Sequence, residues 1–456
     1  MAKTASQDQQ SAQSHTALDF MAWDAAALTA EGRARQAALL MLDTLGVYIA
    51  AHPMEAGRIA REAATRLYGA TDPKDQARIP LDDRICSRAG MAFAAASQID
   101  NLDGHDGYNP TKGHIGCAVI PALLAEAEGR DISSTESLAC LVLGYEIAGR
   151  AGIALHNTVT DYHTSGAWNS IGVAAIGARI RGLSNDQLRH AWGISEYHGP
   201  RSQMMREIAN PTMLHDGSGM GALVGLSAVT LAELGFTGAP AITIEAPDVA
   251  EYWNNLGTFW QIDHQYIKPY PTCRWAHAAI DAMHALRTTH VIDPTQIEQI
   301  EIRSFHNAIA LVGHMPRTTS EAQYALGFNV ATMALKGRIG LDQISGDGLT
   351  DPATAALLKR IKLVEDPRFE AHYPEGRWAE VEVTLNDGTI LNSGETHARG
   401  GPERPMPEQE LHAKFMEFAA PVLGKPRADQ IWTTGLALAD GDMPFSAFTD
   451  LLSEAP

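Results

Sequence analysis

The densest group of polar side chains lies between residues 98 and 116, in the stretch QIDNLDGHDGYNPTKGHIG, just before an apolar helix predicted over 118–127. Carboxylates and imidazoles placed together can exchange protons with a substrate. A loop rich in such groups and packed on a buried helix is typical of an active-site wall, although a solvated loop before a helix is the alternative. The candidate residues in this stretch are Asp100, Asp103, His105, Tyr108, Lys112 and His114.

Aspartate and histidine together could also bind a metal ion. The stretch has neither the HxxxH nor the HExxH spacing, however, and we therefore predict no metal site.

Two further histidines each precede a segment rich in small residues. His163 stands before the predicted helix 165–180, and His215 before the predicted helix 219–234. The free N–H groups of a helix N-terminus can bind an anion, so both histidines are candidates for a carboxylate site. For each of them, a structural role at the start of a helix is the alternative.

Three potential cations lie within ten residues of each other in IKPYPTCRWAHAA, namely Lys268, Arg274 and His277. The formal net charge of the 456-residue chain is −19, which makes a local gathering of cations notable. Arginine can hold a carboxylate with two hydrogen bonds, and lysine acts as a point charge. This segment predicts a carboxylate clamp, the alternative being a surface turn with solvated charges.

Other function classes are disfavoured by what the sequence contains. The acidic charge argues against nucleic acid and against an anionic membrane as partners. The sequence has no GxSxG or GxxxxGK[ST] motif and no GxGxxG after a predicted strand, so nothing supports an acyl-serine mechanism or a nucleotide cofactor. The four cysteines show no paired spacing, which favours reduced thiols and a cytoplasmic location. We expect no membrane-spanning helix, and a disordered tail rather than a signal peptide over residues 1–16.

The hydrophobic spacing predicts a mainly α protein with two domains. Apolar residues recur at three-to-four spacing over 27–50, which predicts a helix, Ser133 and Glu136 have capping-box spacing before an apolar run, and 165–180 is rich in Gly and Ala. In contrast, 300–302 and 381–385 alternate, and Asp387-Gly388 predicts a hairpin. We therefore predict a large helical domain over 17–265, to which 401–456 returns, and a smaller α+β domain over 266–400.

These segments, in this order, resemble the MmgE/PrpD family, which includes 2-methylcitrate dehydratase, cis-aconitate decarboxylase and iminodisuccinate epimerase. The similar stretches are QAALLMLDTLGVYIA, QIDNLDGHDG with GHIGCAVIPALLA, DYHTSGAWNSIGVAAIGARI, KPYPTCRWAHAAIDA, AQYALGFNVATMALKGRIG and VEVTLNDGT with RGGPERPMPEQELHAKF. The resemblance extends from about Ala27 to Phe418 and implies an all-helical domain, an α+β lid domain and a homodimer. It also implies an active site in the cleft between the domains, with no metal or organic cofactor.

The resemblance also implies roles for the candidate residues. Lys268 and Arg274 would hold a small carboxylate substrate, His163 or His114 would transfer protons, and the two aspartates would orient a histidine. The residues predicted to act in catalysis are Asp100, Asp103, His114, His163, Lys268 and His277. Those predicted to bind substrate are His105, Arg274, His215, Lys112 and Tyr108.

The chain departs from the family pattern where family decarboxylases and dehydratases usually carry a lysine, shortly before the histidine that His215 matches. Here Pro211-Thr212-Met213 stands in that place, so a tricarboxylate would have one anchor fewer. Arg201, Arg206 or Lys112 could replace this charge. We predict a cofactor-independent lyase of a small polycarboxylate; the alternatives are an epimerase of a small dicarboxylate and an inactive carboxylate-binding relative.

Overall fold

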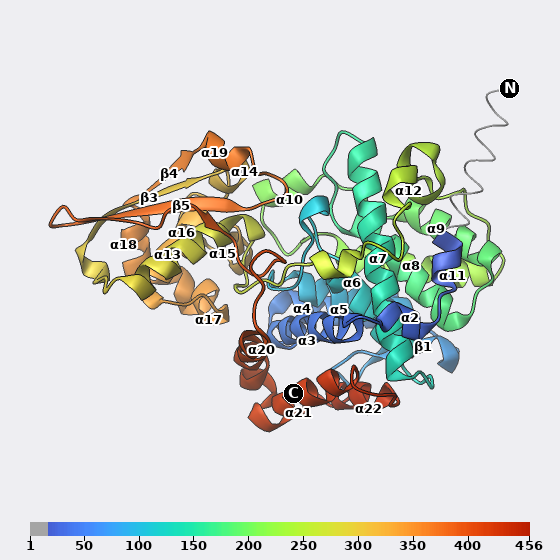
Figure 1. Cartoon of the computed structure of the whole chain (residues 1–456). Helices are drawn as coiled ribbons and strands as arrows, with labels where there is room; N and C mark the ends of the chain where they lie inside the picture. Colours follow the sequence, from blue (N-terminus) through green and yellow to red (C-terminus); the bar gives the residue numbers. More distant parts are fainter. Residues whose placement is uncertain (1–16) are drawn as a thin grey trace. The chain divides into compact units, whose positions relative to one another are not determined.

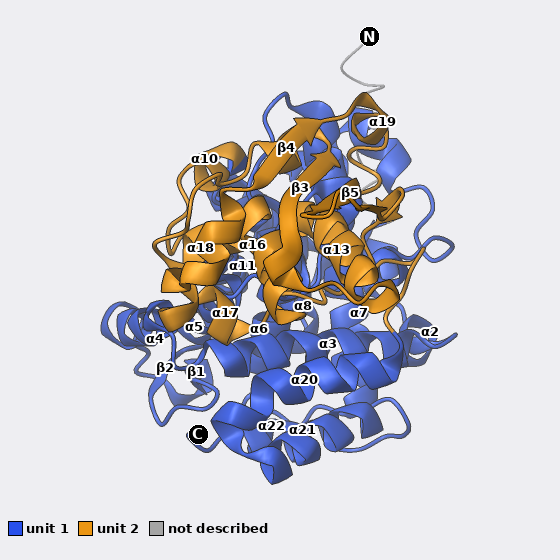
Figure 2. Cartoon of the chain, turned by 90° about the vertical axis from the view of Figure 1, so that its left-hand side faces the viewer, with its two compact units in different colours: residues 1–204, 215–265, 407–456 blue, residues 205–214, 266–406 orange. Residues whose placement is uncertain are grey.

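The computed structural model describes residues 17–456, which form two compact units (Figure 2). Unit 1 contains the chain up to residue 204 together with 215–265 and 407–456, and unit 2 contains 205–214 and 266–406. Unit 1 is built mainly of helices and unit 2 combines helices with a sheet, which confirms the predicted fold class. The tail predicted over 1–16 lies outside the described residues.

Unit 1 is a set of packed helices in which α7 runs beside α8 (Figure 1). Its longer helices are α3 (Arg33–Ala51), α4 (Glu55–Leu67), α5 (Arg88–Asp100), α6 (Gly116–Ala127), α7 (Ser134–Thr158), α8 (Gly166–Arg181), α9 (Asn185–His198), α11 (Ser218–Glu233), α20 (Glu408–Leu423) and α21 (Lys425–Ala437). Its shorter elements include α2 (Ala25–Thr29), α12 (Ile242–Glu245), α22 (Ser446–Thr449) and the antiparallel pair β1 (Gln76–Arg78) and β2 (Ile85–Ser87).

The first predicted helix is interrupted. The apolar spacing over 27–50 suggests one helix, but α2 ends at Thr29 and α3 begins at Arg33. Gly32 between them has φ = 83°, a left-handed conformation that an α-helix does not contain. The apolar positions that carry the spacing, from Ala34 to Ile49, all lie within α3, and Leu28 is the buried residue of α2.

Small residues allow α8 and α11 to approach closely. A Cβ atom on Gly221 of α11 would lie 2.8 Å from the Cα atom of Gly166 in α8, and one on Gly166 would lie 2.2 Å from the carbonyl oxygen of Gly217. No side chain fits at such distances. This contact fixes the N-terminal ends of the two helices, where His163 and His215 were predicted to act.

Helix α7 is long and apolar enough to span a membrane when only length and composition are considered. In the structure, 94% of its apolar window is buried against the rest of the protein, the pattern of a core helix. Its start is the predicted cap, because the Ser133 hydroxyl accepts a hydrogen bond from the Glu136 amide at 3.2 Å.

Unit 2 contains a five-stranded sheet with the order β4-β3-β5-β6, in which β7 also pairs with β5. Strands β3 and β4 are parallel and the other pairs are antiparallel. The strands are β3 (Ile297–Ser304), β4 (Ile361–Glu365), β5 (Trp378–Leu385), β6 (Ile390–Asn392) and β7 (Thr396–His397). The predicted hairpin joins β5 to β6, with Gly388 at φ = 84°.

The principal helices of unit 2 are α13 (His277–Thr289) and α16 (Leu326–Lys336), which pack on each other, and α13 also packs on β5. In β5, Ala379, Val381 and Val383 alternate inward, as the period of a half-buried strand requires. The remaining short helices are α10 (Met204–Ala209), α14 (His306–Ile309), α15 (Thr319–Gln323), α17 (Leu341–Ile344), α18 (Pro352–Leu358) and α19 (Pro367–Glu370).

Candidate active site

Asp106, in the middle of the polar loop between α5 and α6, anchors this loop through hydrogen bonds of its carboxylate. The Asp106 carboxylate accepts hydrogen bonds from the Gly116 amide at the start of α6 (3.2 Å) and from the Tyr145 hydroxyl of α7 (3.0 Å). Asp106 and Tyr145 are both fully buried. A Cβ atom on Gly116 would lie 2.4 Å from the Asp106 carboxylate, so only glycine permits this anchor. The loop is therefore a rigid platform for its histidines.

His114 is held between a backbone carbonyl and two carboxylates. Its Nδ1 lies 2.6 Å from the Asp106 carbonyl oxygen, which can only accept, so Nδ1 carries a proton. Its Nε2 lies 3.6 Å from Oδ2 of Asp216 and 4.0 Å from Oδ1 of Asp103. The imidazole is 7% exposed. With Nδ1 fixed, Nε2 is the atom of His114 that can give or take a proton.

The neighbouring His105 faces a different carboxylate. Its ring centroid lies 4.6 Å from that of His114, and its Nε2 lies 3.8 Å from Oδ1 of Asp100. The other oxygen of Asp100 accepts a hydrogen bond from the Ser218 amide at 3.0 Å. Burial and the nearby Asp216 carboxylate raise the pKa of Asp100 well above its usual range, which favours the neutral carboxyl group.

Asp100, His105 and Cys117 place three possible metal-ligand atoms within 4.8 Å of one another. Burial raises the pKa values of both the Asp100 carboxyl and the Cys117 thiol, and the carboxylates nearby raise that of the thiol further. A metal would have to displace both of these protons. The absence of a metal site stays a prediction.

His163 adjoins the same region. His163 forms an isolated β-bridge with Gln203, and the His163 backbone amide donates a hydrogen bond to Nε2 of His156 at 3.2 Å. Burial, and secondarily the positive charge of Arg201, lower the pKa of His163. A neutral imidazole at neutral pH can accept a proton, so His163 is suited to act as a base.

Ser165, two residues after His163, links its segment to His114. The Ser165 hydroxyl donates to Oδ1 of Asp216 at 2.6 Å and accepts from the His114 backbone amide at 3.0 Å. His215, which directly precedes Asp216, is also buried. The structure thus brings Asp100, Asp103, His105, His114 and Asp216 together, with the predicted residues His163 and His215 on adjoining segments.

Tyr108 and Lys112 have structural contacts in the same loop. The Tyr108 hydroxyl donates to Oε1 of Gln261, and Lys112 Nζ lies 4.5 Å from the centroid of the Tyr162 ring. Lys112 adopts a left-handed backbone (φ = 52°) in the turn closed by the bridge between Tyr108 and Gly113. That these two side chains bind substrate stays a prediction.

Unit 2 holds the other predicted residues, all of them buried. Lys268 and His277 have no exposed surface, and Arg274 is 4% exposed. Burial lowers the pKa of His277 well below its usual range, and the charges of Arg274 and Lys268 lower it further, so the three residues are near neighbours.

Arg274 donates to the backbone carbonyls of Arg399 (2.6 Å) and Ala398 (3.1 Å), and its guanidinium lies 4.3 Å from the centroid of the Tyr266 ring. Burial lowers the pKa of Arg274 to about 10, and its Nε makes no hydrogen bond. A buried guanidinium with carbonyl and aromatic neighbours can accept an anion. That Lys268 and Arg274 hold a carboxylate stays a prediction.

Sequence reasoning missed Asp216 and Ser165. Both occur in segments that were singled out for their histidines, in LHDGSG and DYHTSG. The signal available was a carboxylate directly after His215 and a hydroxyl two residues after His163. Their proximity to His114 is a tertiary contact across 51 and more residues, which local spacing does not reveal.

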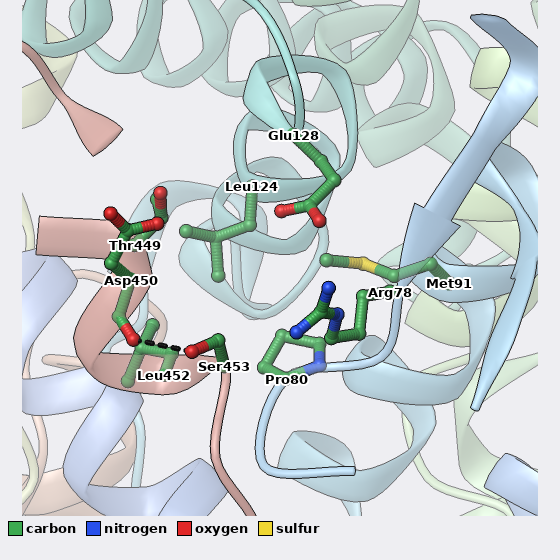
Figure 3. A pocket seen from close by; sticks show the side chains of 9 residues that line it. All are labelled: Arg78, Pro80, Met91, Leu124, Glu128, Thr449, Asp450, Leu452 and Ser453. Atoms are coloured by element: carbon green, nitrogen blue, oxygen red, sulfur yellow. Dashed lines mark hydrogen bonds between the residues drawn. The ribbon is translucent and has the colours of Figure 1, made fainter. Parts of the chain in front are cut away.

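A cavity of about 130 Å³ elsewhere in unit 1 contains none of these residues (Figure 3). Figure 3 shows Arg78 and Glu128 on its wall, with side chains from the C-terminal segment opposite. Its lining residues are Arg78, Pro80, Met91, Leu124, Glu128, Thr449, Asp450, Leu452 and Ser453. The histidine and aspartate cluster is therefore a separate candidate site.

Comparison with known proteins gives matches along most of the chain. Residues 22–249 match the MmgE/PrpD N-terminal domain, and residues 270–440 match the MmgE/PrpD C-terminal domain. The chain is 24% identical to cis-aconitate decarboxylase of Mus musculus, over 76% of this chain and 75% of that protein. It is 26% identical to cis-aconitate decarboxylase of Homo sapiens, over 73% of each chain.

A third relative matches over a shorter stretch. The mitochondrial 2-methylcitrate dehydratase of Yarrowia lipolytica is 29% identical over 135 residues, which is 28% of this chain and 26% of that protein. The two domain matches together span the helical unit and the sheet-containing unit in the order in which the family combines them. The chain belongs to the MmgE/PrpD family.

Proposed function

We propose that this protein is a lyase that acts on a small polycarboxylate by acid–base chemistry. Membership of the MmgE/PrpD family supports this proposal, as do relatives named cis-aconitate decarboxylase and 2-methylcitrate dehydratase. The observation that carries it is His114, with Nδ1 fixed on the Asp106 carbonyl and Nε2 facing two carboxylates. We propose that His114 Nε2 is the proton donor.

The reaction class requires an acid and a base with different proton affinities. Removing a proton from carbon beside a carboxylate needs an unprotonated base, and a departing hydroxyl or a carbanion left by carbon dioxide needs a proton. Two carboxylates face Nε2 of His114, whereas burial and the charge of Arg201 lower the pKa of His163. We therefore assign the acid to His114 and the base to His163.

The cations that would hold the substrate carboxylates are Lys268 and Arg274. Both are buried, and the described hydrogen bonds of Arg274 go to backbone carbonyls, while the more distant Asp281 and Glu403 carboxylates only partly oppose the lowering of its pKa by burial. A charged carboxylate bound there would offset the cost of burying the guanidinium. The acid–base chemistry assigned to the histidines needs no cofactor.

Proton NMR in D₂O tests the reaction class. The purified full-length protein, treated with chelator, is incubated with 2-methylcitrate, cis-aconitate, citrate and amino-dicarboxylates of the iminodisuccinate type. Appearance of a vinyl proton or loss of a carboxylate supports the lyase. Deuterium exchange at an alpha carbon without a new product would replace it with an epimerase. Absence of turnover and of exchange, with and without added divalent metal, would count against it and favour the binding-only relative.

A further inference from the structure

Asp216 is the carboxylate nearest to the reactive nitrogen of His114 among the contacts that the structure describes. Its Oδ2 lies 3.6 Å from Nε2, against 4.0 Å for Oδ1 of Asp103, and Asp216 is 3% exposed. Its other oxygen accepts from the Ser165 hydroxyl at 2.6 Å. The two described contacts of the Asp216 carboxylate thus go to the Ser165 hydroxyl and to the His114 imidazole.

The backbone of Asp216 is strained in a way that keeps this position. The φ angle of Asp216 is 48°, in the left-handed region that residues other than glycine, asparagine and aspartate rarely adopt. Its carbonyl oxygen accepts from the Gly166 amide at the start of α8 (2.9 Å). The segment is thus tied to α8 through both the backbone and the side chain, and strained residues of this kind gather at functional sites.

The described polar groups around His114 come from three segments. Asp103, His105 and Asp106 lie on its own loop, Asp216 precedes α11, and Ser165 is a neutral group that precedes α8. The Asp106 carboxylate is taken up by the Gly116 amide and the Tyr145 hydroxyl. The two carboxylates that face Nε2 are therefore Asp216 and Asp103, and the former is the closer.

Asp100 does not compete for the same proton transfer. Its Oδ2 accepts from the Ser218 amide and its Oδ1 faces His105. Two carboxyl groups that interact in a buried site titrate apart, one retaining its proton while the other ionises. Asp100 is the group that holds a proton more strongly than usual, since burial and the charge of Asp216 both raise its pKa. Asp100 thus faces His105, whereas the carboxylate oxygen closest to Nε2 of His114 belongs to Asp216.

We infer that Asp216 is a positioning residue that keeps the proton on Nε2 of His114, so that this imidazole enters the reaction as the acid. The inference deepens the proposed function and rests on it for its catalytic meaning. The part that concerns the proton on His114 holds for the protein without substrate, and it can be measured there. Asp103 provides a second, more distant charge.

Nitrogen NMR of protein labelled with ¹⁵N-histidine tests this inference directly. The titration of His114, assigned by its loss in His114→Gln, is followed in the full-length wild-type protein and in Asp216→Asn. Asparagine suits a left-handed backbone, and its carbonyl can accept from Ser165. We expect the midpoint of His114 to fall by about one pH unit, a tenfold change in the proton equilibrium. Asp186→Asn, at an exposed position of α9, is the matched control and should leave the midpoint unchanged.

A second variant distinguishes the loss of the Asp216 charge from a disturbance of the fold. Asp216→Gly relieves the backbone strain and also removes the carboxylate, so it should show the same fall in the His114 midpoint. If both variants keep the wild-type midpoint within a few tenths of a unit, the inference is wrong. Where turnover is found, the alkaline limb of kcat should move to lower pH in both variants. Loss of turnover on the whole substrate panel would overturn the proposed function, whereas the titration alone decides the role of Asp216.

Discussion

At the scale of the residue, the structure separates two kinds of histidine that the sequence presents alike. His114 faces carboxylates, while His163, His156 and His277 have pKa values lowered by burial. A sequence gives the positions of these imidazoles but not the charge or the solvent around each one. That is why either His114 or His163 could be proposed as acid or base from spacing alone.

His156 offers a test of this electrostatic description that does not depend on activity. Burial lowers the pKa of His156 in the folded protein to about 4, whereas the ordinary value in an unfolded chain is about 6.5. As the pH falls below 6.5, the unfolded chain therefore binds a proton on His156 before the folded protein does. The folded state therefore loses stability as the pH falls from 6.5 towards 4. Relative to wild type, His156→Gln should gain on the order of 2 kcal/mol in free energy of unfolding between pH 6.5 and 4.5.

Urea unfolding of both proteins at the two pH values measures this gain. The exposed His198, on α9, provides the control variant His198→Gln, which should show no comparable gain. An equal pH dependence in wild type and His156→Gln would contradict a buried, neutral His156.

At the scale of the element, the helices predicted over 118–127, 165–180 and 219–234 correspond to α6, α8 and α11, because runs of apolar and small residues favour buried helices. The hairpin between β5 and β6 followed from Asp387-Gly388, and the start of α7 from the spacing of Ser133 and Glu136. The break at Gly32 was missed because the apolar spacing that predicted this helix lies within α3 and says nothing about α2. The grouping of residues 205–214 with unit 2 could not be predicted, since it depends on contacts such as that of Tyr324 with Glu207 at 2.8 Å.

The contact between α8 and α11 predicts a sharp sensitivity to side-chain size. In Gly221→Ala the new Cβ would lie 2.8 Å from the Cα and carbonyl oxygen of Gly166, backbone atoms that cannot rotate away. We expect a loss of about 2 kcal/mol in free energy of unfolding, typical of overpacking. Denaturant unfolding measures it, with Gly69→Ala as the control, because a Cβ there would meet nothing within 4 Å. Equal midpoints for the two variants would show that the helices are not in this contact.

At the scale of the whole molecule, the chain returns to unit 1 after unit 2, and the returning helix α20 contacts the polar loop between α5 and α6. Lys414 of α20 donates to Asp43 of α3 at 2.6 Å and to the Gly104 carbonyl oxygen at 2.7 Å. Gly104 follows Asp103 directly, and both Lys414 and Asp43 are buried. The return was predicted from the helical pattern after residue 400, but its contact with the loop joins residues 310 apart in the sequence.

Removal of this buried cation should destabilise the protein and disturb the loop. Lys414→Met leaves the Asp43 carboxylate buried without its cation, which costs about 3 kcal/mol in free energy of unfolding. The exposed pair of Lys425 with Asp429 is the matched case, and Lys425→Met should cost less than about 0.5 kcal/mol. Chemical denaturation of the three proteins measures both values. A Lys414→Met variant as stable as Lys425→Met would refute the role of the return helix.

If His114 transfers the proton in a lyase reaction, the rate of product formation should fall sharply in His114→Gln. Rates are followed by proton NMR with the substrate that the wild-type protein turns over, beside His198→Gln as the control. We expect kcat to fall at least about 100-fold in His114→Gln, as for loss of a general acid, and to stay near the wild-type value in the control. A His114→Gln variant that is folded and retains wild-type kcat would contradict it.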